Sequence, residues 1–136
     1  MMKAGDVKLA VLAVACTAGV GLGANYLWVD HGPDHDWDTC LNWKVAGSGE
    51  ECYPSTTDDD GKIPYTDDPN GWTVNLINVD RMDVLTIQGK VTFEAMQPAT
   101  PVTLKANSLL IDAIEETEDT WVELSQWATI LIEEPE

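Results

Sequence analysis

Three similar units of alternating apolar residues occupy the second half of the chain and restrict it to β-sheet architectures. The units are "LTIQGKVTF", "VTLKANSLLI" and "VELSQWATILI", and they begin at residues 85, 102 and 122. Each contains two apolar-x-apolar pairs around a short linker, with Gly89 in the first linker and Asn107 and Ser108 in the second. A period of two is the pattern of strands with one buried face. Starts 17 and 20 residues apart are close to the length of one solenoid coil, so we expect an all-β domain built as a short β-solenoid.

The same stretches also fit a second β architecture. Counted as about seven short strands joined by hairpins, they match a small antiparallel β-sandwich or jelly roll. In that arrangement Gln88 and Gly89 form a two-residue hairpin turn. Both arrangements make residues 72–136 the β-domain, and both include the strand pattern "WTVNL", which begins at Trp72.

An uncharged apolar segment, residues 9–29, precedes this domain. As a helix its 21 residues span about 30 Å, which matches the hydrocarbon core of a bilayer. Lys3 and Lys8 precede the segment and Asp30 follows it, so the positive-inside rule places the chain after Asp30 outside the cytoplasm. We expect residues 1–29 to form one apolar helix. Four fates are open for this helix: a retained anchor, a cleaved signal peptide, a lipoprotein leader with Cys16 lipidated, or a buried helix within an assembly.

This leader contains residues suited to packing in a membrane. Small side chains at every fourth position let helices approach closely, and amphipathic aromatic rings favour the bilayer interface. The predicted membrane and helix-packing residues are Ala15, Gly19, Gly23, Tyr26 and Trp28.

Two of the three cysteines lie in the acidic region 30–71, in the stretch "TCLNWKVAGSGEECYP". If this region is exported it meets an oxidising compartment, where Cys40 and Cys52 should form a disulfide. The bridge would close a loop with a stabilisation of about 3 kcal/mol in the chain-entropy model. We expect this loop to cover the first coil of the β-domain, with Trp37 and Trp43 as its apolar lid.

Several short motifs between residues 36 and 95 together suggest a family. They are "DWDTCLNW", "CYPSTTDDDGKIP", "WTVNL" and "LTIQGKVTF". This pattern resembles one found in surface proteins of marine bacteria and of their viruses, where it opens a β-solenoid or another β-rich surface module. The resemblance implies a structural surface protein and no catalytic activity.

The charge of the chain excludes one class of partner. It has 24 acidic residues against 7 Lys and Arg, a net charge of -17. A domain of this charge is repelled by phosphate backbones, so nucleic acid is not expected as a partner.

The sequence contains no recognisable catalytic motif. Its two histidines, His31 and His35, lie in one linker-like stretch, and no Ser-His-Asp or Gly-rich phosphate motif surrounds them. We therefore expect no enzyme activity.

Two ligand classes nevertheless suit residues of this chain. Clustered carboxylates on loops are chemically suited to calcium, although they also occur as solvated acidic loops. The candidate calcium ligands are Asp34, Asp36, Asp38, Asp58 and Asp60. Tryptophan can stack on sugar rings when exposed, although it more often fills a core. The candidate glycan-stacking residues are Trp37, Trp43 and Trp127.

These observations favour a non-enzymatic structural protein of a virion or a cell envelope. In this hypothesis the N-terminal helix tethers an extracytoplasmic β-domain, which acts by assembly with copies of itself or with neighbouring proteins. The alternative is a secreted module that binds glycans or calcium. We expect no cofactor, with calcium as the one candidate.

Overall fold

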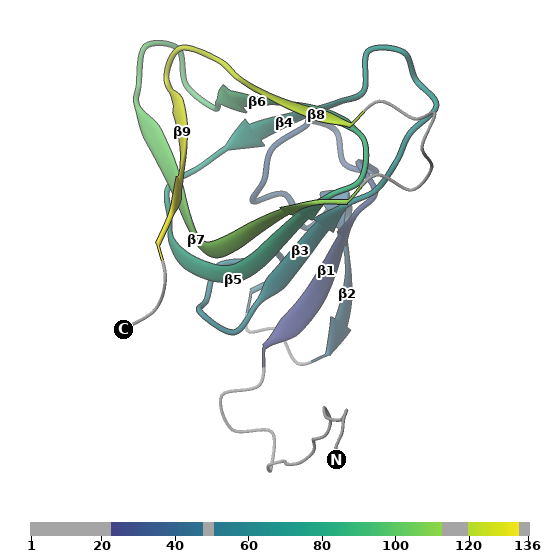
Figure 1. The fold of residues 1–136 in the computed structure, drawn as a ribbon, viewed down its shortest axis with the longest axis vertical. Helices are drawn as coiled ribbons and strands as arrows, with labels where there is room; N and C mark the ends of the chain where they lie inside the picture. Colours follow the sequence, from purple (N-terminus) through teal and green to yellow (C-terminus); the bar gives the residue numbers. More distant parts are fainter. Residues whose placement is uncertain (1–22, 48–50, 113–119, 134–136) are drawn as a thin grey trace.

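The computed structural model describes residues 23–47, 51–112 and 120–133, and their regular secondary structure is almost entirely β-strand (Figure 1). The prediction of an all-β fold is therefore confirmed. The strands are β1 Ala24–Trp28, β2 Trp43–Gly47, β3 Asp60–Ile63, β4 Trp72–Leu76, β5 Val79–Ile87, β6 Lys90–Ala95, β7 Val102–Ile111, β8 Trp121–Leu124 and β9 Ala128–Ile132. One turn of 3-10 helix, Cys40–Asn42, precedes β2.

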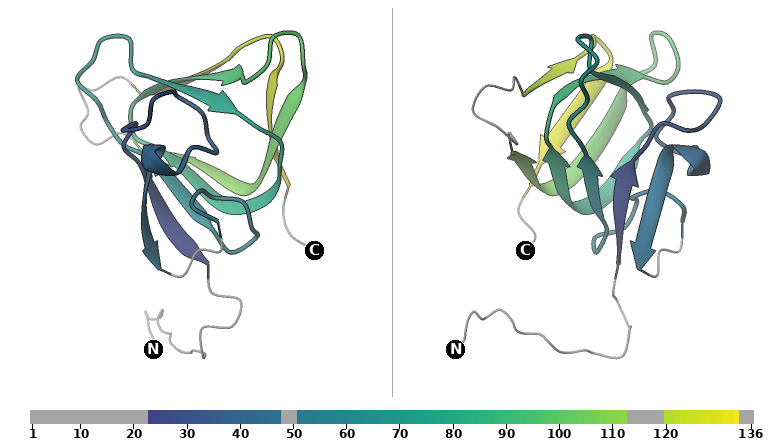
Figure 2. Two further views of the ribbon diagram at one scale, coloured as in Figure 1. Left: turned by 180° about the vertical axis from the view of Figure 1, so that it is seen from behind. Right: turned by 90° about the vertical axis from the view of Figure 1, so that its right-hand side faces the viewer.

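The strands form two sheets that face each other across one core (Figure 2). The larger sheet has the order β2-β1-β3-β5-β7-β9, and the smaller sheet has the order β4-β6-β8. From β3 onward consecutive strands alternate between the sheets, so each strand pairs with the strand two places later in the chain. All of these pairs are parallel, and β1 with β2 forms the antiparallel pair. We call one strand of the larger sheet together with the next strand of the smaller sheet a circuit.

This topology corrects three details of the sequence interpretation. The antiparallel alternative required β5 and β6 to form a hairpin across Gln88 and Gly89, but these strands lie in different sheets. Asn107 and Ser108 do not form a turn either, because they lie inside the continuous strand β7. The spacing of paired residues also differs from 17 and 20: Gly61 pairs with Leu85, and Leu85 pairs with Leu109, 24 residues apart in each case.

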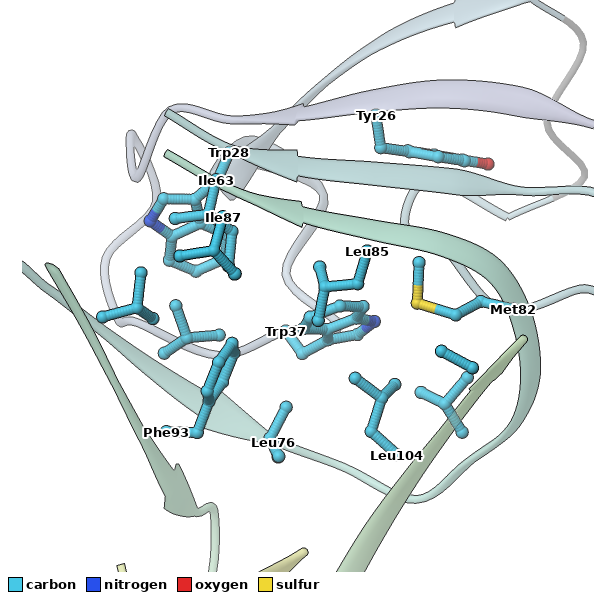
Figure 3. Close-up of a cluster of buried hydrophobic side chains, with 14 of the residues drawn as sticks. Tyr26, Trp28, Trp37, Ile63, Leu76, Met82, Leu85, Ile87, Phe93 and Leu104 are labelled. Atoms are coloured by element: carbon cyan, nitrogen blue, oxygen red, sulfur yellow. The ribbon is translucent and has the colours of Figure 1, made fainter. Parts of the chain in front are cut away.

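The core lies between the sheets and follows the predicted alternation. Leu85 and Ile87 of β5 are fully buried, as are Val91 and Phe93 of β6. Figure 3 shows Trp37 among these side chains, in the middle of the core. Alternate positions of each strand therefore define the inner faces of the two sheets.

The start of the described chain corrects the helix prediction for its last residues. Residues 1–22 lie outside the described part of the chain, and the packing residues Ala15 and Gly19 lie there too. Ala24–Trp28 form strand β1 rather than a helix, and the side chains of Tyr26 and Trp28 are buried in the core instead of lying at a membrane interface. A short apolar run is compatible with either a helix or a buried strand, and aromatic residues favour the strand. Within the described residues, no helix is long and apolar enough to cross a membrane.

Gly23 lies directly before β1 and packs against the backbone of Asp58. A Cβ atom at this position would overlap the Asp58 carbonyl group, so the close approach requires glycine. The residue thus has a role in the packing of the β-fold.

Region 30–71, which was expected to be a loop region, contributes strands to the sheets. β2 pairs with β1, and β3 pairs with both β1 and β5.

Candidate functional site at the open end of the sheets

The two ends of the core differ, and the first circuit is covered by a lid. The lid consists of residues 35–43, held by the disulfide that Cys40 forms with Cys52, whose Cα atoms are 5.0 Å apart. The predicted disulfide is confirmed. Trp37 is fully buried and donates from its indole Nε1 to the Pro54 carbonyl at 3.0 Å, across the loop that the disulfide closes. Trp43 is also buried, and its Nε1 donates to the Trp37 carbonyl at 2.6 Å.

The lid also pairs with the first strand of the smaller sheet. Trp37 N–H donates to the Asn75 carbonyl and Asn75 N–H donates to the His35 carbonyl, each at 2.8 Å. Residues 35–37 therefore occupy the outer edge of β4, through a parallel bridge between Asp36 and Asn75. Edge-to-face ring contacts of Trp43 with Trp28 at 5.1 Å and with Trp37 at 4.9 Å between centroids complete the cover. The core is thus closed at this end.

Two residues that the sequence reasoning did not select hold the lid and its loop in place. Asn42 is buried, and its side-chain Nδ2 donates to the carbonyls of Asp34 and Asp36, at 3.0 Å each, while its Oδ1 accepts from Gly32 N–H. Asp59, which lies in the sequence between the candidate calcium ligands Asp58 and Asp60, is buried. Its carboxylate accepts hydrogen bonds from the backbone N–H groups of Ala24, Ser55 and Thr56. Buried polar groups are normally satisfied in this way. The "TDDDG" run gave no sign of which aspartate would turn inward.

Within the part of the chain that the structure describes, the opposite end of the core is uncovered, as the burial of paired inward-facing residues shows. Ile63, Ile87 and Ile111 occupy equivalent positions in β3, β5 and β7. The first two are fully buried, but Ile111 is 46% exposed. Val74, Phe93 and Leu124 form the equivalent series in the smaller sheet, where Leu124 is 44% exposed. The loss of burial follows position in the stack, because no further circuit lies against these residues in the described structure.

The last strand of the larger sheet shows the same change. Ala106 of β7 is fully buried, whereas its partner in β9, Ile132, is 43% exposed. We define the open end as the inward-facing side chains of the last strands together with the outer edges of β8 and β9. Its inward-facing side chains are Leu109, Ile111, Val122, Leu124, Ile130 and Ile132.

The backbone of β9 also lacks partners on its outer side within the described residues. Glu133 N–H donates to the Ala106 carbonyl at 3.0 Å, and the Trp127 carbonyl accepts from Val102 N–H at 2.9 Å. Alternate residues of a strand direct their N–H and C=O groups to opposite sides, so Ile130 and Ile132 direct theirs away from β7. β9 therefore presents a free strand edge, a template for pairing with another strand.

β8 presents a second free edge in the smaller sheet, again judged from the described part of the chain. Trp121 N–H donates to the Gly89 carbonyl and Ser125 N–H donates to the Phe93 carbonyl, toward β6. The backbone groups of Val122 and Leu124 therefore point outward. Exposed apolar side chains surround the two edges: Leu110, Trp121, Trp127 and Leu131 are each more than one third exposed.

Charged residues of both signs lie near the open end, since Lys105 of β7 pairs in register with Leu131 of β9 and Lys90 of β6 pairs with Trp121 of β8. From residue 106 to residue 136 the sequence contains nine acidic residues and no Lys or Arg. Of those in the described part, Glu123 lies on β8, Glu133 follows β9 and Asp112 follows β7. Arg81 reaches Glu133 from β5, with 3.7 Å between its guanidinium and the carboxylate. Among the described residues, an apolar surface with charged side chains of both signs nearby is thus left at this end.

The candidate calcium ligands are instead used in local hydrogen bonds. Asp34 accepts from Thr39 Oγ1 at 2.7 Å and from Asp36 N–H at 3.1 Å, and these bonds lower the pKa of its carboxyl group. Asp36 accepts from the Asn75 side chain at 2.9 Å. Across the described residues there is no group of three His, Cys, Asp or Glu side chains arranged to hold a metal ion, Asp38 and Asp58 included. Calcium binding stays a prediction.

A shallow hollow of about 430 Å³ lies on the outer face of the larger sheet, where Asp60 is one of its lining residues. The Asp60 carboxylate accepts from Val84 N–H at 3.1 Å. Burial raises the pKa of the Asp60 carboxyl group, the bond from Val84 opposes this shift, and the nearby Asp83 carboxylate adds to it. The hollow thus contains a carboxylate that is destabilised in its charged form.

The three predicted glycan-stacking residues do not share a surface. Trp37 and Trp43 are buried in the lid and core, so they present no ring face to a sugar, and this part of the prediction is wrong. Trp127 is 38% exposed, in the connection between β8 and β9 at the open end. His35 Nδ1 lies 2.8 Å from Asp30 Oδ1, within hydrogen-bond distance.

Comparisons with known proteins add no relative to this description. The chain matches no protein-family model, and no match was found among curated proteins or among solved structures.

Proposed function

We propose that this chain is a non-enzymatic structural protein of a virion or a cell envelope, and that it works by docking to another component through its open end. The fold we infer is a short β-solenoid, closed at one end by the disulfide-held lid and left open at the other. The N-terminal apolar segment tethers this body at a membrane. The body itself lies outside the cytoplasm.

The observation that carries the proposal is the exposure of core-type side chains in the last circuit. Ile111, Leu124 and Ile132 occupy positions whose partners one circuit earlier are fully buried, yet each is more than 40% exposed. Contiguous exposed apolar surface of this kind marks interaction sites in soluble proteins. A repeat protein that works alone normally places a polar cap over its last repeat.

The disulfide supports the proposed location. A bridge between Cys40 and Cys52 is expected to persist in an oxidising compartment, and cytosolic proteins rarely keep one. The acidic surface agrees with a solvated body that does not bind anionic phosphates or membrane surfaces. The chain outside the tether therefore has the chemistry of an exported protein.

Fractionation of native particles tests the proposal. Virions or envelopes are purified from the source on a density gradient, and the chain is quantified by mass spectrometry in each fraction under non-reducing conditions. The expected result is co-sedimentation in a fixed ratio to the major particle protein, with Cys40 and Cys52 oxidised. Recovery of the chain only as a free monomer, or with both thiols reduced in the cytosol, would contradict it. The free monomer is the outcome expected of a secreted glycan- or calcium-binding module.

A further inference from the structure

We propose that the outer face of the larger sheet binds a neutral oligosaccharide, in a groove that crosses β2, β1, β3 and β5. The ligand is a chain of hydroxyl-rich sugar rings without ionised groups, and its hydroxyls bond to the side chains of Asn25, Asp60, Lys62 and Thr86. This face is separate from the open end, so its role is additional to the docking proposed above and does not depend on it.

Two adjoining hollows form the groove. The first, of about 430 Å³, is lined by residues of β1, β3 and β5, and the second, of about 340 Å³, by residues of β1, β2 and β3. They share Asn25 and Lys62, so together they cross four neighbouring strands (Figure 1), about 15 Å at ordinary strand spacing. Leu27 and Val84 supply apolar surface on which the C–H face of a sugar ring can lie. The groove therefore has room for several linked rings rather than for one ion.

Strand register brings the polar side chains of the groove together. Asn25 of β1 is paired with Asp60 of β3, and Lys62 of β3 is paired with Thr86 of β5. All four lie between buried neighbours on their strands, so they face outward. Within the described part of the chain, the side chains of Asn25, Lys62 and Thr86 make no hydrogen bond, and Asp60 accepts one from Val84 N–H. Each of the four thus keeps donors or acceptors for a ligand.

The charges around the groove favour a ligand without a net charge. Asp60 and Lys62 lie two residues apart on one face of β3, yet no ion pair joins them among the described residues. Lys44 adds a second cation beside β1, and Asp83 adds a second carboxylate near Asp60. An anion would be attracted by the lysines and repelled by the aspartates, and a cation the reverse. A hydroxyl group both donates and accepts, so it bonds to carboxylate and ammonium alike.

Asp60 occupies a position that costs the fold stability. Burial and the nearby Asp83 disfavour its charged form, as the raised pKa of its carboxyl group shows. Hydrogen bonds donated by a ligand to the carboxylate would offset this cost. A perturbed carboxylate in a hollow is characteristic of binding sites, and here it stands beside three side chains with unused hydrogen-bonding groups.

Oligosaccharide binding tests the site with the full-length, oxidised chain, kept in solution by a detergent without a sugar headgroup. The probes are neutral oligosaccharides of glucose, mannose, xylose or galactose, about three to six rings long so that they cross the four strands. They are screened as an array and then titrated by calorimetry. The controls are an oligosaccharide of galacturonic acid and the zwitterion glycylglycine. We expect at least one neutral series to bind with a Kd of about 1 mM or tighter, at least about tenfold more tightly than either control.

Protein variants locate the binding at the groove. Lys62→Met keeps the aliphatic stem and removes the donors, and Thr86→Val keeps the shape and removes the hydroxyl, so each should weaken binding about tenfold. The matched controls, Lys105→Met and Thr92→Val, make the same changes on β7 and β6, outside both hollows, and should leave binding unchanged.

Asp60→Asn separates binding from folding. It replaces a charged acceptor by a neutral one, so it should weaken binding about tenfold. The same change removes a disfavoured charge, so the melting temperature should rise rather than fall. Lost binding in this variant therefore cannot come from unfolding, which keeps the test valid if Lys62→Met or Thr86→Val does not fold.

Three results would overturn the proposed site: no binding of any neutral series, binding of a control as tight as that of every neutral series, or binding that Asp60→Asn and Lys62→Met leave intact in folded proteins. None of these results decides the proposed function, because particle fractionation tests that separately. A particle component that binds no neutral glycan would retain the proposed function and lose this site.

Discussion

Removal of the disulfide should destabilise the whole β-body by loosening its lid. The perturbation is the double variant Cys40→Ser with Cys52→Ser, compared with the wild type before and after reduction. The Trp37 indole donates a hydrogen bond to the Pro54 carbonyl, and both residues lie just outside the loop that the bridge closes. Without the bridge, no covalent cross-link joins the lid to the segment around Pro54. The core itself is otherwise unchanged.

The expected size follows from the separation of the two cysteines. For 12 residues, the chain-entropy model gives about 3 kcal/mol at 25 °C. For a chain of 136 residues, this loss corresponds to a fall in Tm of about 10 °C. Differential scanning calorimetry measures it, with reductant added to the wild type as an independent route to the same state.

A matched control separates the bridge from the surface of the loop. Leu41 lies beside Cys40 with its side chain exposed, so Leu41→Ser should change the unfolding free energy by less than about 0.5 kcal/mol. An unchanged melting curve for the double variant would refute the reasoning, because it would mean that the lid covers the core without its covalent link.

Three further predictions concern single residues away from the open end. Asp60→Asn should raise Tm by about 2 °C at pH 7, because it removes a charge that burial and Asp83 disfavour. Because the pKa of Asp60 is raised in the folded protein, protonation of Asp60 favours the folded state. The gain in Tm from Asp60→Asn should therefore disappear as the pH falls below 3.8, the ordinary pKa of an aspartate. Melting curves at a series of pH values would show this. Gly71→Ala should cost more than about 1 kcal/mol in urea unfolding, since Gly71 has a φ of +72° and a Cβ there would overlap the Lys90 backbone. Asp34→Ala should lower Tm at pH 7, and this difference should shrink as the pH falls below 3.8. The reason is that the lowered pKa of Asp34 gives a stabilisation that is present above the unfolded pKa and is lost as the pH falls through the folded one. A constant difference between the Asp34→Ala and wild-type curves across this pH range would contradict that assignment.

The elements that the sequence predicted well are those whose burial depends on local alternation. Leu85, Ile87, Val91 and Phe93 were expected on inner faces and are fully buried there, because a period of two fixes which side of a strand a residue faces. Pairing between strands is a non-local property. The same pattern fitted parallel circuits and antiparallel hairpins, and it did not show that β7 continues through Asn107.

Composition alone could not separate a helix from a strand in the apolar leader. Residues 24–28 were expected to end a helix, whereas β1 pairs with both β2 and β3. The lid residues Trp37 and Trp43 were predicted from the cysteine spacing and the need to cover the first coil, and both are buried at that end.

The open end was the least predictable feature. The last apolar run has the same alternation as the buried strands before it, so nothing in the pattern distinguishes Ile132 from Ile87. Their exposure differs because one has a neighbouring strand on its outer side and the other has none in the described structure. That difference depends on stacking order and can be recognised only once the topology is known.

Site-specific photo-crosslinking in native particles tests the docking role of the open end most directly. A photoreactive phenylalanine derivative replaces Trp127, an exposed residue between β8 and β9, and a matched sample carries it at Leu41 on the lidded end. The account predicts that the probe at Trp127 cross-links to another protein of the particle, and that the probe at Leu41 does not. Equal cross-linking from both sites, or none from Trp127 in intact particles, would contradict it.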